Sequence, residues 1–182
     1  MNRIKFSWIG SIFLTIPLFL LCACSILPGN QASSPQSSAT GAAGTESQIA
    51  QAVFQAINQS RAANGLAPLK WSNALAKSAR QHDLAMQAAN TLAHQLPGEA
   101  DLGKRESQQG VNWTFAAENI GETTDQSVNG ALGLHQAMMN EKPPDDGHRQ
   151  NILTTNGNIV GVDILIDQQH GKLWLTEDFA QV

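Results

Sequence analysis

The segment VGVDILIDQQHGKLWLTEDF, residues 160–179, carries the clearest secondary-structure pattern of the chain. Its apolar side chains alternate from Val160 to Ile166, which is typical of a strand with one buried face. Residues 168–171 interrupt the run with Gln-Gln-His-Gly, and apolar residues resume over 173–179. Two apolar runs separated by a short polar stretch that contains glycine predict an antiparallel hairpin.

Helical patterns precede this hairpin. Apolar residues recur at helical spacing, Ser72 is a suitable N-cap, and the pair Pro143-Pro144 stops a helix. A looser alternation over residues 113–120 predicts one further strand. Helices that come first and a hairpin that comes last, without regular alternation of strand and helix, predict an α+β fold. The predicted helices span residues 49–64, 72–89, 127–141 and, capped by Asp145, 145–153.

The amino terminus has the pattern of an export signal. Two basic residues precede an apolar run over residues 8–21, which is too short to span a bilayer comfortably. The run ends in Leu-Cys-Ala-Cys, residues 21–24, which resembles the lipobox of bacterial lipoproteins. A plain secretory signal, or an uncleaved anchor, is the alternative interpretation.

The lipobox resemblance implies that residues 1–23 are a signal peptide and that Cys24 becomes the lipidated first residue of the mature chain. Two or more acyl chains suffice for stable anchoring. The sequence therefore predicts an exported protein that is lipid-anchored to a bacterial membrane through Cys24 and faces the periplasm or the cell exterior.

Residues 24–45 have the composition of a flexible tether. From Ile26 to Thr45 the chain has no charged residue, and Ser, Ala, Gly, Gln and Pro dominate. Such a segment cannot bury enough apolar area to offset its ordering entropy. The remaining residues, 46–182, have the length of one domain with a single core, and we expect a monomer.

Composition excludes several classes of protein. Loss of Arg3 and Lys5 with the signal lowers the number of basic residues from 11 to 9 against 15 acidic ones, a net charge of about −6. This charge argues against binding to nucleic acid or to anionic head groups. If Cys24 is lipidated and Cys22 is removed, the folded part has no thiol, which excludes disulfides, a Cys nucleophile and Cys-ligated zinc.

Four residues are candidates for chemistry: His94, Glu118, Glu141 and His148. Glu141 lies in the last turn of a predicted helix, where its charge opposes the helix dipole by roughly 0.3–1 kcal/mol. His148 lies in the first turn of the next helix, where the dipole keeps the ring neutral, as a metal ligand or general base requires. A structural interpretation fits the same spacing: Glu141 is then a solvated helix end, and His148 donates a hydrogen bond to the turn.

Other polar residues receive structural interpretations. His82 and His135 lie on apolar helical stripes, so we expect both to pack in the core. His170 belongs to the predicted hairpin turn and should be solvated. Arg105 lies in an irregular stretch before Glu118, where we expect it to brace loops.

Residues 147–153, Gly-His-Arg-Gln-Asn-Ile-Leu, resemble the Gly-His-Arg-x-Asn-Ile-Leu signature of bacterial CAP domains, the superfamily of cysteine-rich secretory proteins, antigen 5 and pathogenesis-related 1 proteins. The resemblance extends over nearly all of residues 50–181. Further segments that match in the family's order are Asn58-x-x-Arg61 with Asn64-Gly65-Leu66, Ala93-His94, Glu118-Asn119-Ile120, Val160-Gly161-Val162 and Thr176-Glu177-Asp178-Phe179.

The resemblance implies a fold and a site. The fold is a three-layer α-β-α sandwich with a central antiparallel sheet, formed here by residues 46–182. The site is a surface cleft with two histidines and two glutamates, which map onto His94, Glu118, Glu141 and His148 as a cavity tetrad.

Two functions are compatible with this tetrad, and whether the protein is an enzyme stays open. The favoured one is a binding module for a small apolar ligand, a cell-wall fragment or a protein partner outside the cytoplasm. The alternative is a hydrolase or peptidase with a divalent metal such as zinc on His94 and His148, and with Glu118 or Glu141 as general base. The chain has no His-Glu-x-x-His motif, and two histidines fall short of the usual three protein ligands.

Overall fold

The computed structural model describes residues 37–182, with side chains from Thr45 onward. The predicted signal peptide, Cys24 and the tether up to residue 36 lie outside the described residues. In the described part, no helix combines the length and the apolar character that a membrane crossing requires.

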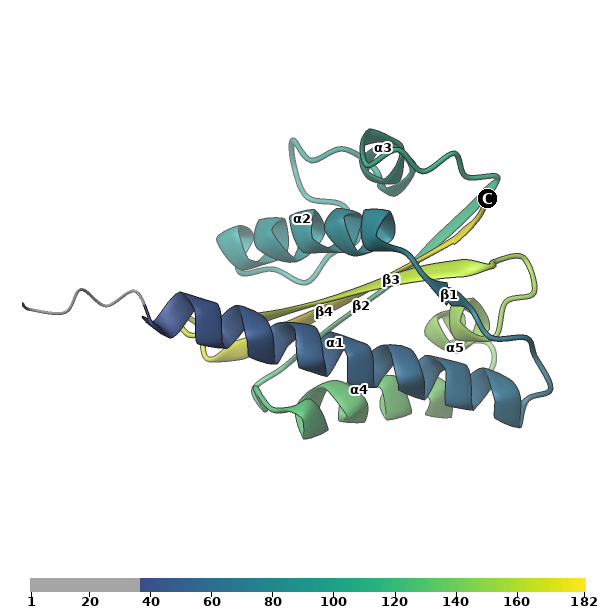
Figure 1. The fold of residues 1–182 in the computed structure, drawn as a ribbon, viewed down its shortest axis with the longest axis horizontal. Helices are drawn as coiled ribbons and strands as arrows, with labels where there is room; N and C mark the ends of the chain where they lie inside the picture. The colour runs from purple at the N-terminus through teal and green to yellow at the C-terminus, as the bar shows by residue number, and fades with distance from the viewer. Residues whose placement is uncertain (1–36) are drawn as a thin grey trace, which may run out of the picture. The chain divides into compact units, whose positions relative to one another are not determined.

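Helices and a four-stranded sheet alternate irregularly along the chain, which confirms the predicted α+β class (Figure 1). In chain order the elements are α1 (Ser37–Ala63), β1 (Lys70–Trp71), α2 (Asn73–Ala89), α3 (Leu102–Gln108), β2 (Phe115–Thr123), α4 (Val128–Asn140), α5 (Gly147–Ile152), β3 (Ile159–Asp167) and β4 (Lys172–Gln181).

The sheet has the strand order β1-β3-β4-β2. Strands β3 and β4 form the predicted antiparallel hairpin, with Leu165 paired to Trp174, and β2 lies antiparallel to β4 on the other side. Strand β1 pairs with β3 in parallel over two residues, so the expected antiparallel sheet gains a short parallel edge. Two residues are too few for an alternation pattern, which is why the sequence did not predict this strand.

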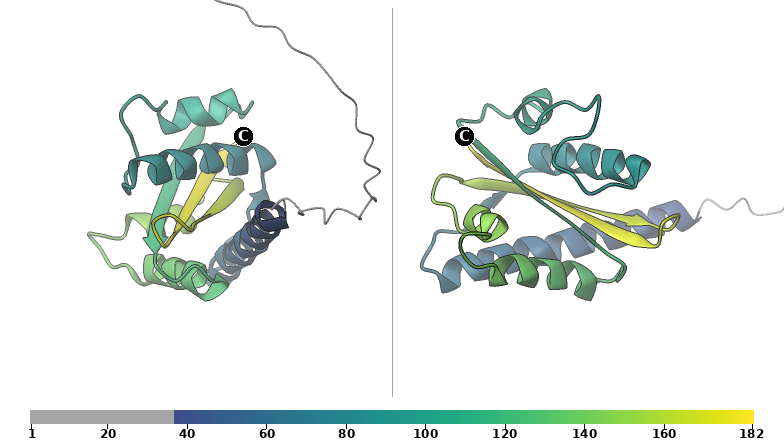
Figure 2. Two further views of the ribbon diagram at one scale, coloured as in Figure 1. Left: turned by 90° about the vertical axis from the view of Figure 1, so that its left-hand side faces the viewer. Right: turned by 180° about the vertical axis from the view of Figure 1, so that it is seen from behind.

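The sheet lies between two helical layers, as expected for an α-β-α sandwich. Helices α1, α4 and α5 cover one face, and α2 and α3 cover the other (Figures 1 and 2). Successive side chains of the β3–β4 hairpin face opposite sides of the sheet and pack with different helical layers. Ile164 packs with residues of α1 and α4, whereas Leu165 and Trp174 pack with Met86 of α2.

Helix α1 begins earlier than expected. Residues 37–45, predicted to belong to the tether, are helical. The apolar stripe of Ile49, Val53 and Ile57 is buried and fixes the helix, and extending a fixed helix into an Ala-containing stretch costs little because nucleation is already complete. Glu46 holds this part of the helix to the sheet, since its carboxylate accepts a hydrogen bond of 2.8 Å from the backbone N–H of Ile166.

Of the two predicted helix N-caps, Ser72 is confirmed and Asp145 is wrong. Ser72 is the N-cap of α2, and its hydroxyl accepts a hydrogen bond from the backbone N–H of Leu75, as predicted. Helix α3 was not predicted because it has only seven residues; Asp101 caps it. Helix α5 begins after Asp146, so the prediction that Asp145 caps it is wrong.

Candidate functional site

His94, Glu118, Glu141 and His148 line one surface cleft of about 370 Å³, together with Asp145, Gly147 and Asn151. The four come from different parts of the fold. His94 lies in the loop after α2, Glu118 is in β2, Glu141 is the residue that ends α4, and His148 is in the first turn of α5. Their chemical roles stay predictions at this point.

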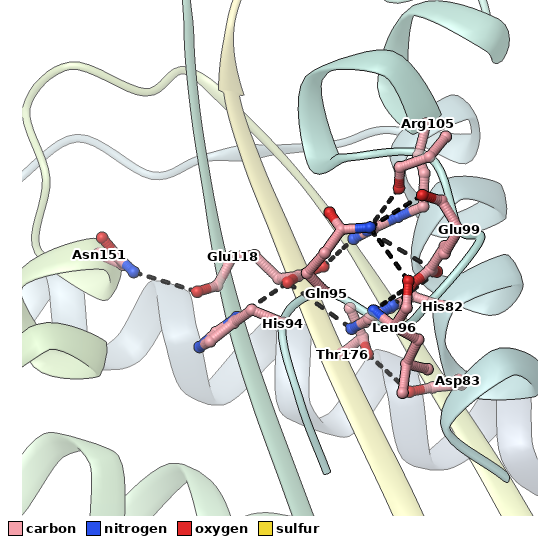
Figure 3. Close-up of polar contacts among 11 residues, drawn as sticks. His82, Asp83, His94, Gln95, Leu96, Glu99, Arg105, Glu118, Asn151 and Thr176 are labelled. Atoms are coloured by element: carbon pink, nitrogen blue, oxygen red, sulfur yellow. Dashed lines mark hydrogen bonds and ion pairs between the residues drawn. The ribbon is translucent and has the colours of Figure 1, made fainter. Parts of the chain in front are cut away.

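His94 is oriented by Glu118. Its Nδ1 lies 2.9 Å from Oε1 of Glu118. A carboxylate oxygen accepts, so Nδ1 carries the hydrogen and the neutral ring keeps a lone pair on Nε2. The imidazole is 58% exposed while the Glu118 side chain is 3% exposed. Figure 3 shows the second ring nitrogen of His94 pointing away from Glu118.

His148 has the same arrangement with Glu141. Its Nδ1 lies 2.5 Å from Oε1 of Glu141. The other carboxylate oxygen accepts from the backbone N–H groups of His148, at 3.0 Å, and Arg149, at 3.4 Å. Asp146 occupies the N-cap position of α5 but makes no capping hydrogen bond with its side chain. Glu141 therefore caps α5 from the end of α4.

This cap changes the interpretation of the Glu141 charge. The carboxylate follows the carboxyl end of α4, which is unfavourable, but it also meets the amino end of α5, where a negative charge is favourable. Glu141 is not a solvated helix end, because its carboxylate is tied to His148 in two ways.

Arg105 supports Glu118 from inside the domain. One guanidinium nitrogen of Arg105, Nη2, donates to Oε2 of Glu118, and Nη1 donates to the carbonyl of Ala100. The Arg105 side chain is 2% exposed, so the ion pair is buried. The sequence predicted that Arg105 braces loops. It did not predict the contact between Arg105 and the cleft carboxylate, because α3 itself was not predicted.

His82 lies behind the same carboxylate. It is fully buried in α2, as predicted for a core residue. Its Nδ1 lies 2.8 Å from Oε1 of Glu99, whereas Nε2 has no hydrogen-bond partner among the described residues and lies 3.7 Å from Oε1 of Glu118 (Figure 3). His82 thus packs in the core as expected, but its ring forms a hydrogen bond through one nitrogen alone.

Two asparagines connect β2 to α5. Asn119 donates to the carbonyl of His148 at 3.2 Å and to Glu177 at 3.0 Å. Asn151 donates to the side-chain oxygen of Asn119 at 2.9 Å and to the carbonyl of Glu118 at 3.3 Å. These bonds fix the strand that carries Glu118 against the helix that carries His148.

The interior behind the cleft is rich in buried acids. Burial raises the pKa of Glu106 to about 8 and that of Glu177 to about 7, in the second case against the hydrogen bond from Asn119. Burial also raises the pKa of Asp178, which pairs with Glu118 across the sheet. These groups hold protons in the folded protein under conditions in which exposed carboxyls are ionised.

The other two histidines lie away from the cleft. His135 is buried in α4, as predicted, and burial lowers its pKa. His170 is half-buried rather than solvated, because its Nδ1 lies 2.6 Å from Oδ2 of Asp167.

The cleft does not fit a three-ligand zinc site. The described residues contain no group of three or more His, Cys, Asp or Glu side chains placed to hold a metal ion. His94 and His148 each offer one free ring nitrogen, but one oxygen each of Glu118 and Glu141 is used to orient these rings. The arrangement instead offers two directed imidazole nitrogens, carboxylate oxygens and the Asn151 amide to a polar ligand.

Comparison with known proteins gives consistent matches. The sequence model of CAP, the cysteine-rich secretory protein family, matches residues 54–179. The uncharacterized protein YkwD of Bacillus subtilis is 31% identical over 142 residues, which cover 77% of this chain and 50% of that protein. The chain thus spans about half the length of this curated relative.

Solved structures share the fold at lower identity. An extracellular protein containing an SCP domain from Bacillus anthracis superposes with a TM-score of 0.69 at 24% identity, covering 82% of this chain and 45% of that chain. An outer surface protein of Borrelia burgdorferi superposes with a TM-score of 0.64 at 16% identity, covering 74% of this chain and 92% of that chain.

Proposed function

The chain belongs to the CAP, or cysteine-rich secretory protein, family, and from this premise we propose that it is an extracytoplasmic binding module whose ligand occupies the cleft of His94, Glu118, Glu141 and His148. The observation that carries the proposal is the pair of carboxylate-oriented imidazoles. Each ring is held through Nδ1, so each leaves Nε2 available for a ligand.

The lining of the cleft favours a polar ligand. Apart from Gly147, every lining residue carries a charged, imidazole or amide side chain. A small apolar ligand would bury these groups without giving them hydrogen bonds, which is costly. Hydroxyl and amine groups, as in a cell-wall fragment, would instead donate to the free imidazole nitrogens and to the carboxylates.

A metal-dependent hydrolase or peptidase is the second candidate, and it has less support. Carboxylate-oriented histidines are common around metals. A zinc enzyme, however, normally uses three protein ligands, and the described residues offer no group of that size. We therefore propose binding rather than metal-assisted hydrolysis.

The proposal is tested by titrating the protein, in EDTA, with soluble peptidoglycan fragments while the histidine ring signals are followed by NMR. We expect saturable shifts of His94 and His148. His94→Ala should weaken binding by about fivefold, since a lost hydrogen bond costs about 1 kcal/mol and tenfold corresponds to about 1.4 kcal/mol. The ring of His94 is largely exposed, so this variant should fold.

His170→Ala is the matched control, because His170 lies in the β3–β4 turn and outside the cleft. It should bind as the wild type does. If the fragments cause no saturable shift, the proposed ligand class is wrong. Hydrolysis of the fragments in a parallel titration without EDTA, and its absence when EDTA is present, would contradict the binding module and support the metal-dependent enzyme.

We also propose that the domain is exported and anchored through a lipid on Cys24. The support is the apolar run before the Leu-Cys-Ala-Cys sequence at residues 21–24. Cys24→Ser should shift the protein from the membrane fraction to the soluble fraction or leave the signal uncleaved, whereas Cys22→Ser should change little. Fractionation and intact mass measure both effects, and equal mass and membrane association of wild type and Cys24→Ser would refute the anchor.

A further inference from the structure

We propose that Arg105 is a positioning residue of the cleft: it holds the Glu118 carboxylate from inside the domain and thereby fixes His94 in the tautomer that presents the Nε2 lone pair to the cleft. The inference deepens the proposed function and rests on it for its biological purpose. The geometry itself can be tested without any ligand.

The Glu118 carboxylate is shared between two side chains. Oε2 accepts from Arg105 of α3, and Oε1 accepts from His94 at 2.9 Å. His82 of α2 lies behind Oε1, but at 3.7 Å its Nε2 makes no hydrogen bond to it. Rotation of Glu118 about its side-chain bonds would break the contacts with both Arg105 and His94.

The tautomer of His94 depends on Glu118. Among the described residues, Glu118 is the side chain with which the His94 ring hydrogen-bonds. An exposed neutral histidine in water prefers to carry its hydrogen on Nε2. The hydrogen bond to Glu118 reverses that preference because a carboxylate can only accept. The state of His94 in the cleft therefore depends on the orientation of Glu118.

Arg105 is the buried donor that faces Glu118. Its guanidinium lies within ion-pair distance of two carboxylates, those of Glu118 and, at 3.7 Å, Glu99. His82 lies beside them, but its Nδ1 already donates to Glu99, so a neutral His82 ring has a lone pair and no hydrogen on the Nε2 that faces Glu118. Arg105 is therefore the side chain that can hold this carboxylate from inside the domain.

The experiment measures the tautomer of His94 in protein labelled with ¹⁵N-histidine at about pH 8, where exposed imidazoles are neutral. In the wild type, Nδ1 of His94 should carry the hydrogen. In Arg105→Met the ratio of the Nδ1–H to the Nε2–H form should fall by about tenfold, the equivalent of one charge-assisted hydrogen bond. Arg105→Lys retains a donor and should restore part of the ratio.

Leu75→Ala is the matched control. Leu75 is fully buried in α2, as Arg105 almost is in α3, but packs with Val111 and Ala180, away from Glu118. It should destabilise the domain and leave the His94 tautomer unchanged. The His170 ring signal reports whether each variant is folded, and if Arg105→Met does not fold, Arg105→Lys decides the matter, because its tautomer ratio should still lie below that of the wild type.

Two results would overturn the inference. One is a wild-type His94 with its hydrogen on Nε2. The other is a wild-type tautomer ratio in the folded Arg105 variants. Because no ligand is present, these results are independent of whether peptidoglycan fragments bind, so the inference and the proposed function can fail separately.

Discussion

Replacement of Gly161 by alanine is expected to lower the free energy of unfolding by more than about 3 kcal/mol. Gly161 lies in β3 where the strand passes under the first turn of α2. A Cβ at this position would lie 2.1 Å from the backbone nitrogen of Ala76 and 2.3 Å from the backbone carbonyl carbon of Leu75. Both contacts are with helix backbone, which cannot move aside as a flexible side chain can. Urea unfolding monitored by tryptophan fluorescence measures the loss.

Gly133→Ala is the matched control. Gly133 lies inside α4, and a Cβ there would meet nothing within 4 Å. Alanine is a better helix former than glycine by about 1 kcal/mol, so this variant should be as stable as the wild type or more stable. If Gly161→Ala instead unfolds at the wild-type urea concentration, helix α2 does not pack on β3 as closely as described.

Local patterns were sufficient to predict most of the fold. The β3–β4 hairpin follows from alternation on both sides of a polar turn, and α2 follows from an apolar stripe that begins after Ser72. The errors occurred where a pattern is too short or where packing overrides composition. Strand β1 has two residues and α3 has seven, whereas residues 37–45 are helical because the buried stripe of α1 follows them.

The candidate site could be predicted only in part. The spacing of Glu141 and His148 predicted that both lie at the junction between two helices. The family resemblance implied that His94 and Glu118 share one cleft with them. The inner support could not be predicted, because His82–Glu99 and Arg105–Glu118 are pairs of side chains that meet through tertiary packing. A histidine on an apolar helical stripe looks the same whether its ring faces leucines or a carboxylate.

The buried acids around this support connect the architecture of the site to the stability of the whole domain. Glu106 is fully buried in α3, and neither carboxyl oxygen has a hydrogen-bond partner among the described residues. Burial raises its pKa to about 8, raises that of Glu177 to about 7 and raises that of Asp163 to about 6. In the unfolded chain these carboxyls ionise near pH 4. The folded protein therefore binds more protons than the unfolded chain over this range.

The sign of the pH dependence follows from this difference. Between about pH 5 and pH 8 the unfolded chain has released protons that the folded protein retains, so stability falls as pH rises. Burial alone would raise the pKa of Asp167, but hydrogen bonds with His170 and Trp174 lower it to about 2. Asp167 is therefore ionised in the folded protein throughout this range, and its contribution to the free energy of unfolding is constant above pH 5. Burial lowers the pKa of His135, so below about pH 6.5 the unfolded chain takes up a proton that the folded protein does not. This uptake lowers the stability and offsets part of the gain that the buried acids give at low pH.

We therefore expect the domain to be more stable at pH 5 than at pH 8, with Glu106 alone accounting for up to about 4 kcal/mol at roughly 1.4 kcal/mol per pH unit. Glu106→Gln removes the charge but keeps the shape, so it should be more stable than the wild type at pH 8 and similar to it at pH 5. Asp125→Asn is the control, because Asp125 is exposed and hydrogen bonds with Ser127 lower its pKa, which places its titration below this range. Urea unfolding of the three proteins at both pH values measures the slopes. A wild type that is as stable at pH 8 as at pH 5, or a Glu106→Gln variant with the wild-type slope, would show that Glu106 is not held protonated behind the cleft.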